Sequence, residues 1–320
     1  SGLDFDNSGN LWVANSSNPS ALAVLTNEKE WYNFSFGQFL TDDQTGPLLV
    51  DQQNYKWVVL PKGGKGLLIF NDNGTIEDKT DDQSKILNSA IGQGGLPSSD
   101  IYSIAEDHDG EIWVGTAEGV GVFYSPTSIF TGNTNYDAQR IIVEVNGYLQ
   151  YLLGTETVTA IAIDGANRKW FGTKGSGVFL MSADGTTELH HFTAENSPLL
   201  SNFIRCITIN EMTGEVLFGT DNGIIAYKGT ATGEETQTID SYAYPNPVPE
   251  NYSGPIAIKG LPANSAVRIT DIAGNLVFTT ESEGTQAVWN GNDMNGKRVG
   301  TGIYLVFGID GEGNNSQVAK

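Results

Sequence analysis

Three histidines, His108, His190 and His191, are the side chains best suited to acid–base or metal chemistry. His190 and His191 are neighbours in a run that predicts a strand, so their side chains point to opposite faces and do not readily share a metal ion. No HExxH motif, CxxC pair or Gly-x-Ser-x-Gly turn accompanies them. We therefore predict surface histidines, no catalytic residue, no metal ligand and no cofactor. The sequence assigns no binding residue.

The single cysteine, Cys206, lies in the alternating run from Ile204 to Ile209, which predicts a strand. We expect a small buried side chain there rather than a reactive thiol. One cysteine allows no disulfide within the chain. This is compatible with the cytosol and equally with export from a Gram-negative cell.

Two loop sequences resemble ligand-binding loops without matching them. Pro61–Gly66 lacks the GxxxxGK[ST] spacing of a phosphate-binding loop and predicts a hairpin turn. Asp4–Asn10 has oxygen-bearing side chains at alternate positions and Gly9 at the sixth, as in the start of a calcium loop, but the Glu of the twelfth position is absent. The alternative is a simple turn, and calcium near Asp4 and Asp6 stays an open question at this point.

The net charge of −21, from 38 acidic and 17 basic residues, excludes broad binding to nucleic acid, because such a surface repels phosphates. A glycosidase needs two carboxylates that face each other, and with 38 acidic residues the sequence alone does not identify such a pair. No run of eighteen apolar residues is present, so we predict no transmembrane segment. No signal peptide is visible either, and the chain opens inside a strand of a repeat, so we expect further sequence upstream.

One pattern recurs five times and organises the first part of the chain. An apolar strand ends at Asp or Asn, a polar turn follows, a strand with Trp or Leu comes next, and a Gly-containing turn leads to a third apolar strand. Asp stands six residues before Trp in four copies: Asp6/Trp12, Asp51/Trp57, Asp107/Trp113 and Asp164/Trp170. The fifth copy has Asn210 and Leu217, with one residue inserted.

These repeats predict a β-propeller over residues 1–238, with at least five four-stranded blades that form part of a larger propeller. A blade needs about 40–50 residues, and the observed spacings are 45 to 57. Radial stacking buries both faces of each small sheet. We expect each Trp to fill the space between neighbouring sheets, and each Asp to accept hydrogen bonds from amides of the turn that follows it.

A polar segment, Gly229–Thr238, ends the repeats, and we place the domain boundary there. Short alternating strands separated by turns follow it. They predict an immunoglobulin-like β-sandwich over residues 239–320 and an all-β protein overall. The expected strands are 255–259, 266–271, 276–280, 287–289 and 302–307.

Two family resemblances follow from these residues. The repeat, clearest at Ile112-Trp113-Val114-Gly115-Thr116, resembles the two-component-regulator propeller repeat. Four motifs of the tail resemble, in order, the C-terminal sorting domain of type IX secretion cargo in Bacteroidetes and the related flagellar-hook-capping fold: Tyr244-Pro245-Asn246-Pro247, Val267-x-Ile269-x-Asp271-x-x-Gly274, Trp289-x-Gly291-x-Asp293-x-x-Gly296 and Gly302-Ile303-Tyr304. That domain usually ends in a basic residue and an apolar strand, so Val318-Ala319-Lys320 predicts a truncated last strand.

The two resemblances together imply a surface component of the type IX secretion apparatus. Such a component would be non-enzymatic, exported through the periplasm to the cell surface or outer membrane, and would bind a cargo-processing peptidase and anionic lipopolysaccharide. One alternative is the periplasmic ligand-sensing propeller of a two-component system, and another is a secreted carbohydrate-binding protein. The tail favours the first, because a sensor would continue into a membrane helix and a kinase.

Overall fold

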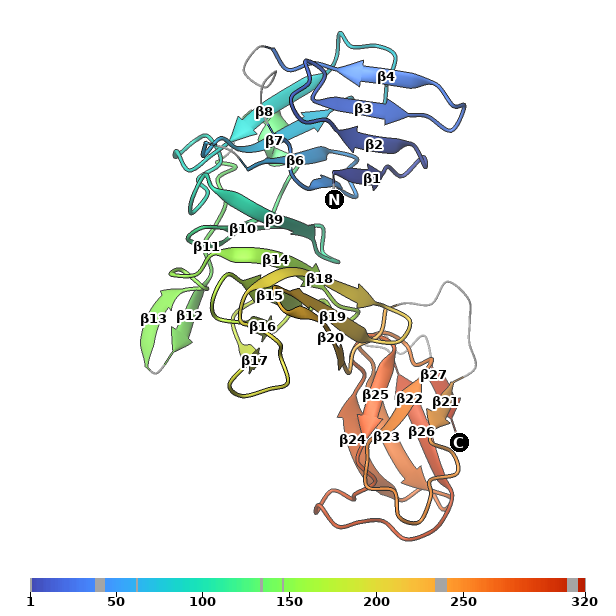
Figure 1. Ribbon diagram of the computed structural model, residues 1–320. Helices are drawn as coiled ribbons and strands as arrows, with labels where there is room; N and C mark the ends of the chain where they lie inside the picture. Colours follow the sequence, from blue (N-terminus) through green and yellow to red (C-terminus); the bar gives the residue numbers. More distant parts are fainter. Residues whose placement is uncertain are drawn as a thin grey trace. The chain divides into compact units, whose positions relative to one another are not determined.

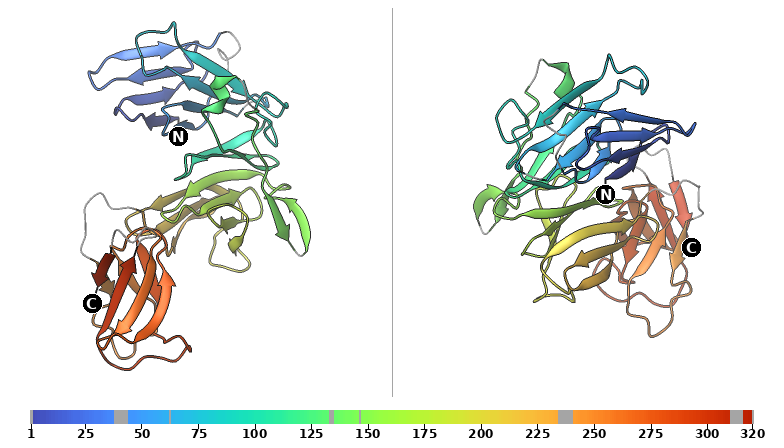
Figure 2. Two further views of the ribbon diagram at one scale, coloured as in Figure 1. Left: turned by 180° about the vertical axis from the view of Figure 1, so that it is seen from behind. Right: turned by 45° about the horizontal axis from the view of Figure 1, so that its top comes forward.

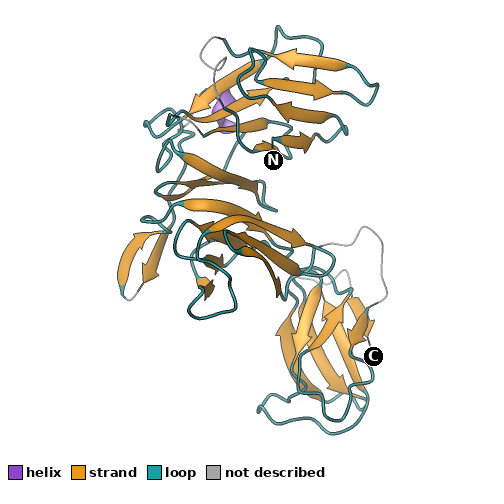
Figure 3. Cartoon of the chain, in the orientation of Figure 1, coloured by secondary structure: helices purple, strands orange, loops and turns teal. Residues whose placement is uncertain are grey.

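The computed structural model describes residues 2–37, 44–61, 63–132, 135–145, 147–233, 241–309 and 316–319. Strands dominate, and α1 (Ser128–Thr131) is the one helix of these residues (Figure 3). The all-β prediction is therefore confirmed. In the described part of the chain, no helix has the length and apolar character needed to cross a membrane.

The chain divides into two compact units. The first comprises Ser1–Ala162, Lys169–Ile207 and Gly219–Ile224. The second comprises Ile163–Arg168, Thr208–Phe218 and Ile225–Lys320. The second unit thus joins short stretches of the repeat region to the C-terminal segment.

Five small sheets follow one another along the repeat region, and we call them blades 1 to 5 (Figure 1). Each is a meander, because its strands are neighbours in chain order. Blade 1 contains β1 (Leu3–Phe5), β2 (Leu11–Ala14), β3 (Leu22–Leu25) and β4 (Trp31–Phe34); blade 2 contains β5 (Leu48–Val50), β6 (Lys56–Leu60), β7 (Gly66–Asn71) and β8 (Gln83–Leu87). Blade 3 contains β9 (Ile101–Glu106), β10 (Ile112–Thr116) and β11 (Gly119–Phe123); blade 4 contains β14 (Val158–Ile163), β15 (Lys169–Thr173), β16 (Val178–Met181) and β17 (Glu188–Phe192). Blade 5 contains β18 (Ile204–Asn210), β19 (Glu215–Thr220) and β20 (Gly223–Lys228).

Over the residues that the structure describes, blades 3 and 5 have three strands each, which differs from the four-stranded expectation. In blade 3 the place beside β11 is taken by a single bridge, in which Val122 and Gln139 exchange backbone hydrogen bonds of 2.9 and 2.8 Å. In blade 5 the chain after β20 enters the segment Gly229–Gly233, which is hydrogen-bonded both to the β18–β19 turn of its own blade and to a loop of the C-terminal domain. The outer edge of a blade is thus the position where its pattern varies.

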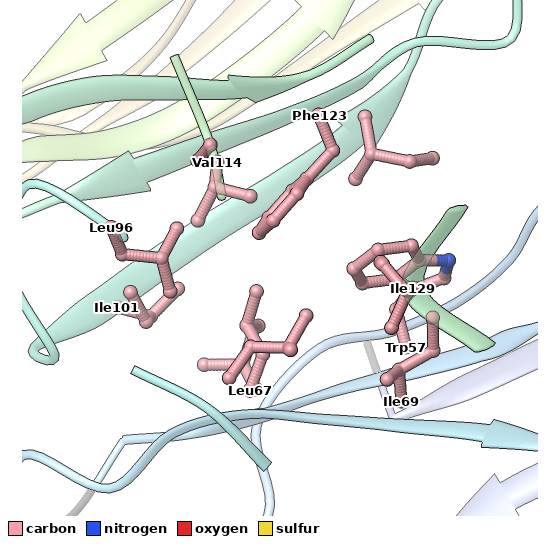
Figure 4. Close-up of a cluster of buried hydrophobic side chains, with 12 residues drawn as sticks. Trp57, Leu67, Ile69, Leu96, Ile101, Val114, Phe123 and Ile129 are labelled. Carbon is pink, nitrogen blue, oxygen red and sulfur yellow. The ribbon is translucent and has the colours of Figure 1, made fainter. Parts of the chain in front are cut away.

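The four repeat tryptophans occupy equivalent positions, as the spacing predicts. They lie in the second strand of their blades and are fully buried: Trp12 in β2, Trp57 in β6, Trp113 in β10 and Trp170 in β15. Three of them pack against an aromatic ring of the following blade. The ring centroids of Trp57 and Phe123 lie 5.5 Å apart, and both residues belong to the apolar cluster between blades 2 and 3 (Figure 4). The expected filling of the space between sheets is confirmed for Trp12, Trp57 and Trp113, whereas the Trp170 ring stacks on Phe192 of its own blade.

The Gly-Thr pair after the Trp strand has two separate structural roles. Thr116, Thr173 and Thr220 each donate a side-chain hydrogen bond of 2.9 Å to the carbonyl oxygen of a glycine at the start of the third strand or directly before it. At Gly115, a Cβ would lie 2.7 Å from the carbonyl oxygen of Val158 in blade 4. The glycine therefore allows two neighbouring blades to approach closely.

A separate hairpin, β12 (Ile142–Val145) and β13 (Tyr148–Tyr151), connects blades 3 and 4. It forms a two-stranded sheet of its own, and Figures 1 and 2 show it standing out from the blade sheets. Its residues lie in the long insertion between the third and fourth repeats.

The C-terminal domain is a sandwich of two sheets around its own core. One sheet has the order β21 (Tyr242–Tyr244), β22 (Ile256–Lys259) and β25 (Gln286–Trp289). The other has the order β24 (Leu276–Glu281), β23 (Ala266–Asp271), β26 (Tyr304–Ile309) and β27 (Ser316–Ala319). Ile258, Ile269 and Trp289 lie in the apolar core between them. The predicted sandwich is confirmed.

Candidate functional site

The Asp of the repeat turn uses its carboxylate to hold both the turn and the Trp. In blade 1, Asp6 Oδ1 accepts the backbone N–H groups of Ser8 and Asn10 at 3.0 and 2.8 Å. Asp6 Oδ2 accepts the indole N–H of Trp12 at 3.0 Å. The same Asp–Trp bond measures 2.8 Å at Asp51/Trp57 and 2.9 Å at Asp107/Trp113. The turn bonds were predicted from the sequence, but the indole bond was not, although the constant six-residue spacing was its signal.

Two buried lysines connect a blade to the Trp of the blade before it. Each stands directly before a repeat Trp, at Lys56 and Lys169. Lys56 Nζ lies 4.3 Å from the Trp12 ring centroid and 2.6 Å from Asp72 Oδ1. Burial lowers the pKa of Lys56, against the opposing effect of Asp72. A cation over an indole face is attracted by the ring quadrupole, so the lysine ties neighbouring blades together.

Lys169 makes the second of these connections, at the border of blades 3 and 4. Its Nζ lies 2.9 Å from Asp107 Oδ2 and 4.9 Å from the Trp113 ring centroid, and both charged side chains are fully buried. Glu111 lies beside Asp107, and burial, with the negative charge of Asp107, raises the pKa of Glu111 to about 7. Sequence reasoning missed this cluster, although the recurrence of Lys before Trp was visible.

The first strands of successive blades are also bonded to one another. Asp4 Oδ2 accepts the backbone N–H of Val50 at 2.8 Å, which connects blades 1 and 2. Glu106 accepts the backbone N–H of Gln52 with both oxygens at 3.0 Å, which connects blades 2 and 3, and burial raises its pKa to about 7. The blade carboxylates therefore serve the scaffold.

Side-chain hydroxyls continue this series of bonds. Ser103 Oγ donates to the carbonyl oxygen of Val158 at 3.0 Å, which connects blades 3 and 4. Thr159 Oγ1 donates to the carbonyl oxygen of Ile204 at 2.5 Å, which connects blades 4 and 5. Every pair of successive blades thus has a side-chain bond between or beside its first strands.

The two loops that resemble ligand-binding loops in the sequence form turns between successive strands of a blade. Asp4 and Asp6 use carboxylate oxygens to accept N–H groups. Among the described residues, no group of three or more His, Cys, Asp or Glu side chains could hold a metal ion. The Pro61–Gly66 loop joins β6 to β7 with Leu60 paired to Gly66, which confirms the hairpin turn; Lys62 lies outside the described residues.

The side chains of the three histidines have different neighbours and form no common site. His190 and His191 occupy successive positions of β17. The His191 ring stacks on Phe179 with 3.9 Å between centroids, and its Nε2 lies 2.7 Å from the Ser176 carbonyl oxygen. His190 lies beside Phe192 instead, and His108 is exposed in its turn.

Cys206 is exposed, so the expectation of a buried cysteine was wrong. It lies on β18, in the three-stranded sheet of blade 5, where no further blade among the described residues covers one face. The alternating sequence identified a strand but could not show which of its faces has a neighbour.

The segment Gly229–Gly233 is bonded into the second unit and does not form a free linker over these residues. Thr232 forms a parallel bridge with Gly284, and Thr285 donates its backbone N–H to the Thr232 carbonyl oxygen at 3.1 Å. A Cβ at Gly284 would lie 1.9 Å from that oxygen, so only glycine fits. Residues 234–240, the rest of the predicted polar segment, lie outside the described residues.

Arg168, in the turn of blade 4, is the charged centre of this junction. Its Nε lies 2.8 Å from Asp164 Oδ2, and its Nη1 lies 3.0 Å from Glu283 Oε2 of the sandwich. The same Nη1 donates to Thr230 Oγ1 at 3.1 Å. In blade 4, therefore, the arginine connects the repeat Asp to the C-terminal domain.

Two segments of the chain match known protein families. Residues 95–118 match the two component regulator propeller, and residues 242–319 match the secretion system C-terminal sorting domain. No curated protein matches the chain. The first match covers β9 and β10 of blade 3, and the second covers the sandwich.

Two solved structures are similar over nearly the whole chain. PorZ, a surface component of the type IX secretion system of Porphyromonas gingivalis, is 32% identical with a TM-score of 0.68, over 99% of this chain and 44% of PorZ. The extracellular domain of a putative hybrid two component system from B. thetaiotaomicron, BT4673, is 13% identical with a TM-score of 0.50, over 99% of this chain and 43% of that one. The chain therefore spans less than half the length of both. The second likeness shows the fold alone.

Proposed function

We propose that this PorZ-like chain, which joins two component regulator propeller blades to a secretion system C-terminal sorting domain, works as a non-catalytic surface component of a type IX secretion system. One observation carries the proposal. The sorting-domain match at residues 242–319 and the 32% identity to PorZ lie in the same chain, and the identity extends over 99% of it.

The geometry supports a binding scaffold. The repeat carboxylates hold turns, indoles and neighbouring blades, as Asp6, Asp51 and Asp107 show. A rigid set of blades with variable loops suits the binding of partners, since function on this fold depends on the loops rather than on the sheets. We propose that the partner is a cargo-processing peptidase of the secretion system.

We further propose that the chain presents anionic lipopolysaccharide for linkage to cargo. The net charge of −21 opposes broad capture of an anionic polymer, so the contact is local. The C-terminal domain offers exposed basic side chains for such a contact, notably Arg268 of β23 and Lys297. Phosphate groups of the glycolipid would pair with these cations.

The lipopolysaccharide proposal has a direct binding test with a matched control. Immobilised lipopolysaccharide from the native host should bind the purified chain. Arg268→Glu with Lys297→Glu should weaken this binding by about tenfold or more, as loss and reversal of two charge-assisted contacts predicts. Lys174→Glu, at an exposed lysine of blade 4, should not. Equal binding by all three proteins would place the contact elsewhere.

The periplasmic sensor and the carbohydrate-binding protein are the competing functions. The fold is compatible with a sensor, because the BT4673 extracellular domain shares it. The sorting-domain match argues against a sensor. Location separates the surface component from the sensor: the surface component should be digested by protease added to intact cells, and lose this surface exposure in a mutant without the type IX translocon. A carbohydrate-binding protein with a sorting domain would have the same location, and the state of the cargo in a deletion strain separates it from the surface component. Full protection in normal cells would favour the sensor.

A further inference from the structure

The hairpin β12–β13 exposes more large apolar side chains than its size explains. Five of its residues are exposed: Ile142, Val145, Tyr148, Leu149 and Tyr151. Tyr148 and Leu149, next to the turn, are 77% and 76% exposed. A lone two-stranded hairpin gains little stability from such residues in water, and contiguous exposed apolar groups mark an interaction site.

The base of the hairpin is firmly held. Ile141, Val143 and Leu152 are buried in the apolar cluster between blades 3 and 4. Leu152 donates its backbone N–H to the Ile141 carbonyl oxygen at 2.8 Å. Arg140 stacks on the Tyr151 ring, 4.0 Å from its centroid. The exposed end of the hairpin around Tyr148 and Leu149, which we call the tip, is therefore attached to a well-packed base.

The apolar side chains lie on both faces of the hairpin. The pairs Ile142–Tyr151 and Glu144–Leu149 share one face, and Val145–Tyr148 lies on the other. A flat protein surface would cover one face and leave the other in water. An occupant that surrounds the tip covers both.

The charge around the tip limits which surface it can meet. Residues 145–155 contain no charged side chain, the exposed Glu144 opposite Leu149 is the one charged residue of the two strands, and the whole chain has a net charge of −21. The acidic remainder is repelled by an anionic surface, and the tip offers no cation to offset this repulsion. A zwitterionic lipid surface matches a tip that has exposed tyrosines and no cation, since tyrosine is favoured where lipid meets water.

We propose that the β12–β13 hairpin is a lipid-contacting tip that enters the headgroup region of an uncharged membrane surface. Its four-residue strands are about 13 Å long at about 3.3 Å per residue, and interfacial elements sink about 5–10 Å. Tyr148 and Leu149 then reach the acyl boundary, while the unpaired strand edges remain among hydrated headgroups.

The full chain should cosediment with phosphatidylcholine vesicles. Tyr148→Ser with Leu149→Ser should weaken binding by about tenfold or more, because two large exposed apolar groups no longer leave water. The matched control is Ile91→Ser, which removes a side chain that is 93% exposed elsewhere in the first unit. This control should bind like the original protein. Unchanged thermal unfolding would show that all variants fold.

Replacing a third of the phosphatidylcholine by phosphatidylglycerol should weaken vesicle binding by the Arg268→Glu, Lys297→Glu variant at low salt, because this variant lacks the cations proposed to contact anionic lipid and is repelled by the added negative charge. No cosedimentation of the original chain, or equal binding by the double variant, overturns the proposal. So does a Leu149-dependent increase in mass in lipid-free sedimentation, which would identify a second copy of the chain as the occupant.

Discussion

The ammonium group of Lys169 in blade 4 lies 2.9 Å from the carboxylate of Asp107 in blade 3, and both side chains are fully buried. The same carboxylate oxygen accepts the indole N–H of Trp113 at 2.9 Å. One oxygen thus joins the Trp of its own blade to a cation of the next blade.

Lys169→Met should lower the free energy of unfolding by about 3–5 kcal/mol, the usual cost of leaving a buried charge without its partner. Urea unfolding of the full chain measures this loss. The double variant Lys169→Met with Asp107→Asn should recover part of it, because no isolated charge remains. A double variant no more stable than the single one would contradict the role given to this pair.

Trp113→Ala should cost about 3–5 kcal/mol of stability, as is usual for truncation of a buried large aromatic residue. Trp31→Ala is the matched control. Trp31 lies on the outer strand of blade 1 and is 56% exposed, so its loss should change stability by less than about 0.5 kcal/mol. Equal melting temperatures for the Trp113 variant and the original chain would show that the ring does not support the blade border.

Glu111 should make the stability depend on pH. Burial raises the pKa of this carboxyl to about 7 from an ordinary 4.5. The unfolded chain therefore releases this proton at lower pH than the folded chain, and stability falls as pH rises from about 4.5 to about 7. Glu111→Gln cannot ionise, so it should exceed the original chain in stability at pH 8 and match it at pH 4.

Urea midpoints at these two pH values measure this effect of Glu111. Glu188→Gln, at an exposed carboxyl of β17, is the control and should follow the original chain at both. A Glu111→Gln advantage of the same size at pH 4 and pH 8 would show that titration of this group is not its cause.

Gly284→Ala should open the junction of the second unit. The added Cβ would lie 1.9 Å from the Thr232 carbonyl oxygen, which displaces the segment Gly229–Gly233. Limited digestion with a non-specific protease should leave this segment intact in the original chain and cut it in the variant. Gly300→Ala, where a Cβ meets nothing within 4 Å, is the control. A cut of the original chain between residues 229 and 233 would contradict the conclusion that hydrogen bonds hold this segment in place.

Repeat spacing was enough to predict the blades and the equivalent burial of Trp12, Trp57, Trp113 and Trp170, because a fixed offset along the chain becomes a fixed place in each sheet. Partners across blades could not be predicted in this way. Lys169 reaches Asp107 from 62 positions away in the sequence, and the recurrence of Lys before Trp does not show which carboxylate is its partner.

The other differences between the sequence-based expectations and the structure have a similar cause. A local alternating sequence identifies a strand, but the burial of each face depends on segments that are distant in the sequence. For this reason the expectation for Cys206 was wrong. Polar composition suggested a linker at Gly229–Thr238, although Thr230 and Thr232 are bonded to Gln286 and Thr285 of the sandwich. The composition of a segment does not reveal which partners its backbone finds.

The state of the cargo proteins in a deletion strain of the native host tests the proposed function most directly. Gel mobility and cell-surface labelling would be compared between the deletion strain, the parent and a complemented strain. We predict that cargo in the deletion strain is secreted but keeps its sorting domain and is not attached to the cell surface, and that complementation restores both. Normal processing and attachment of cargo in the deletion strain, together with loss of a transcriptional response to a sugar, would contradict the account.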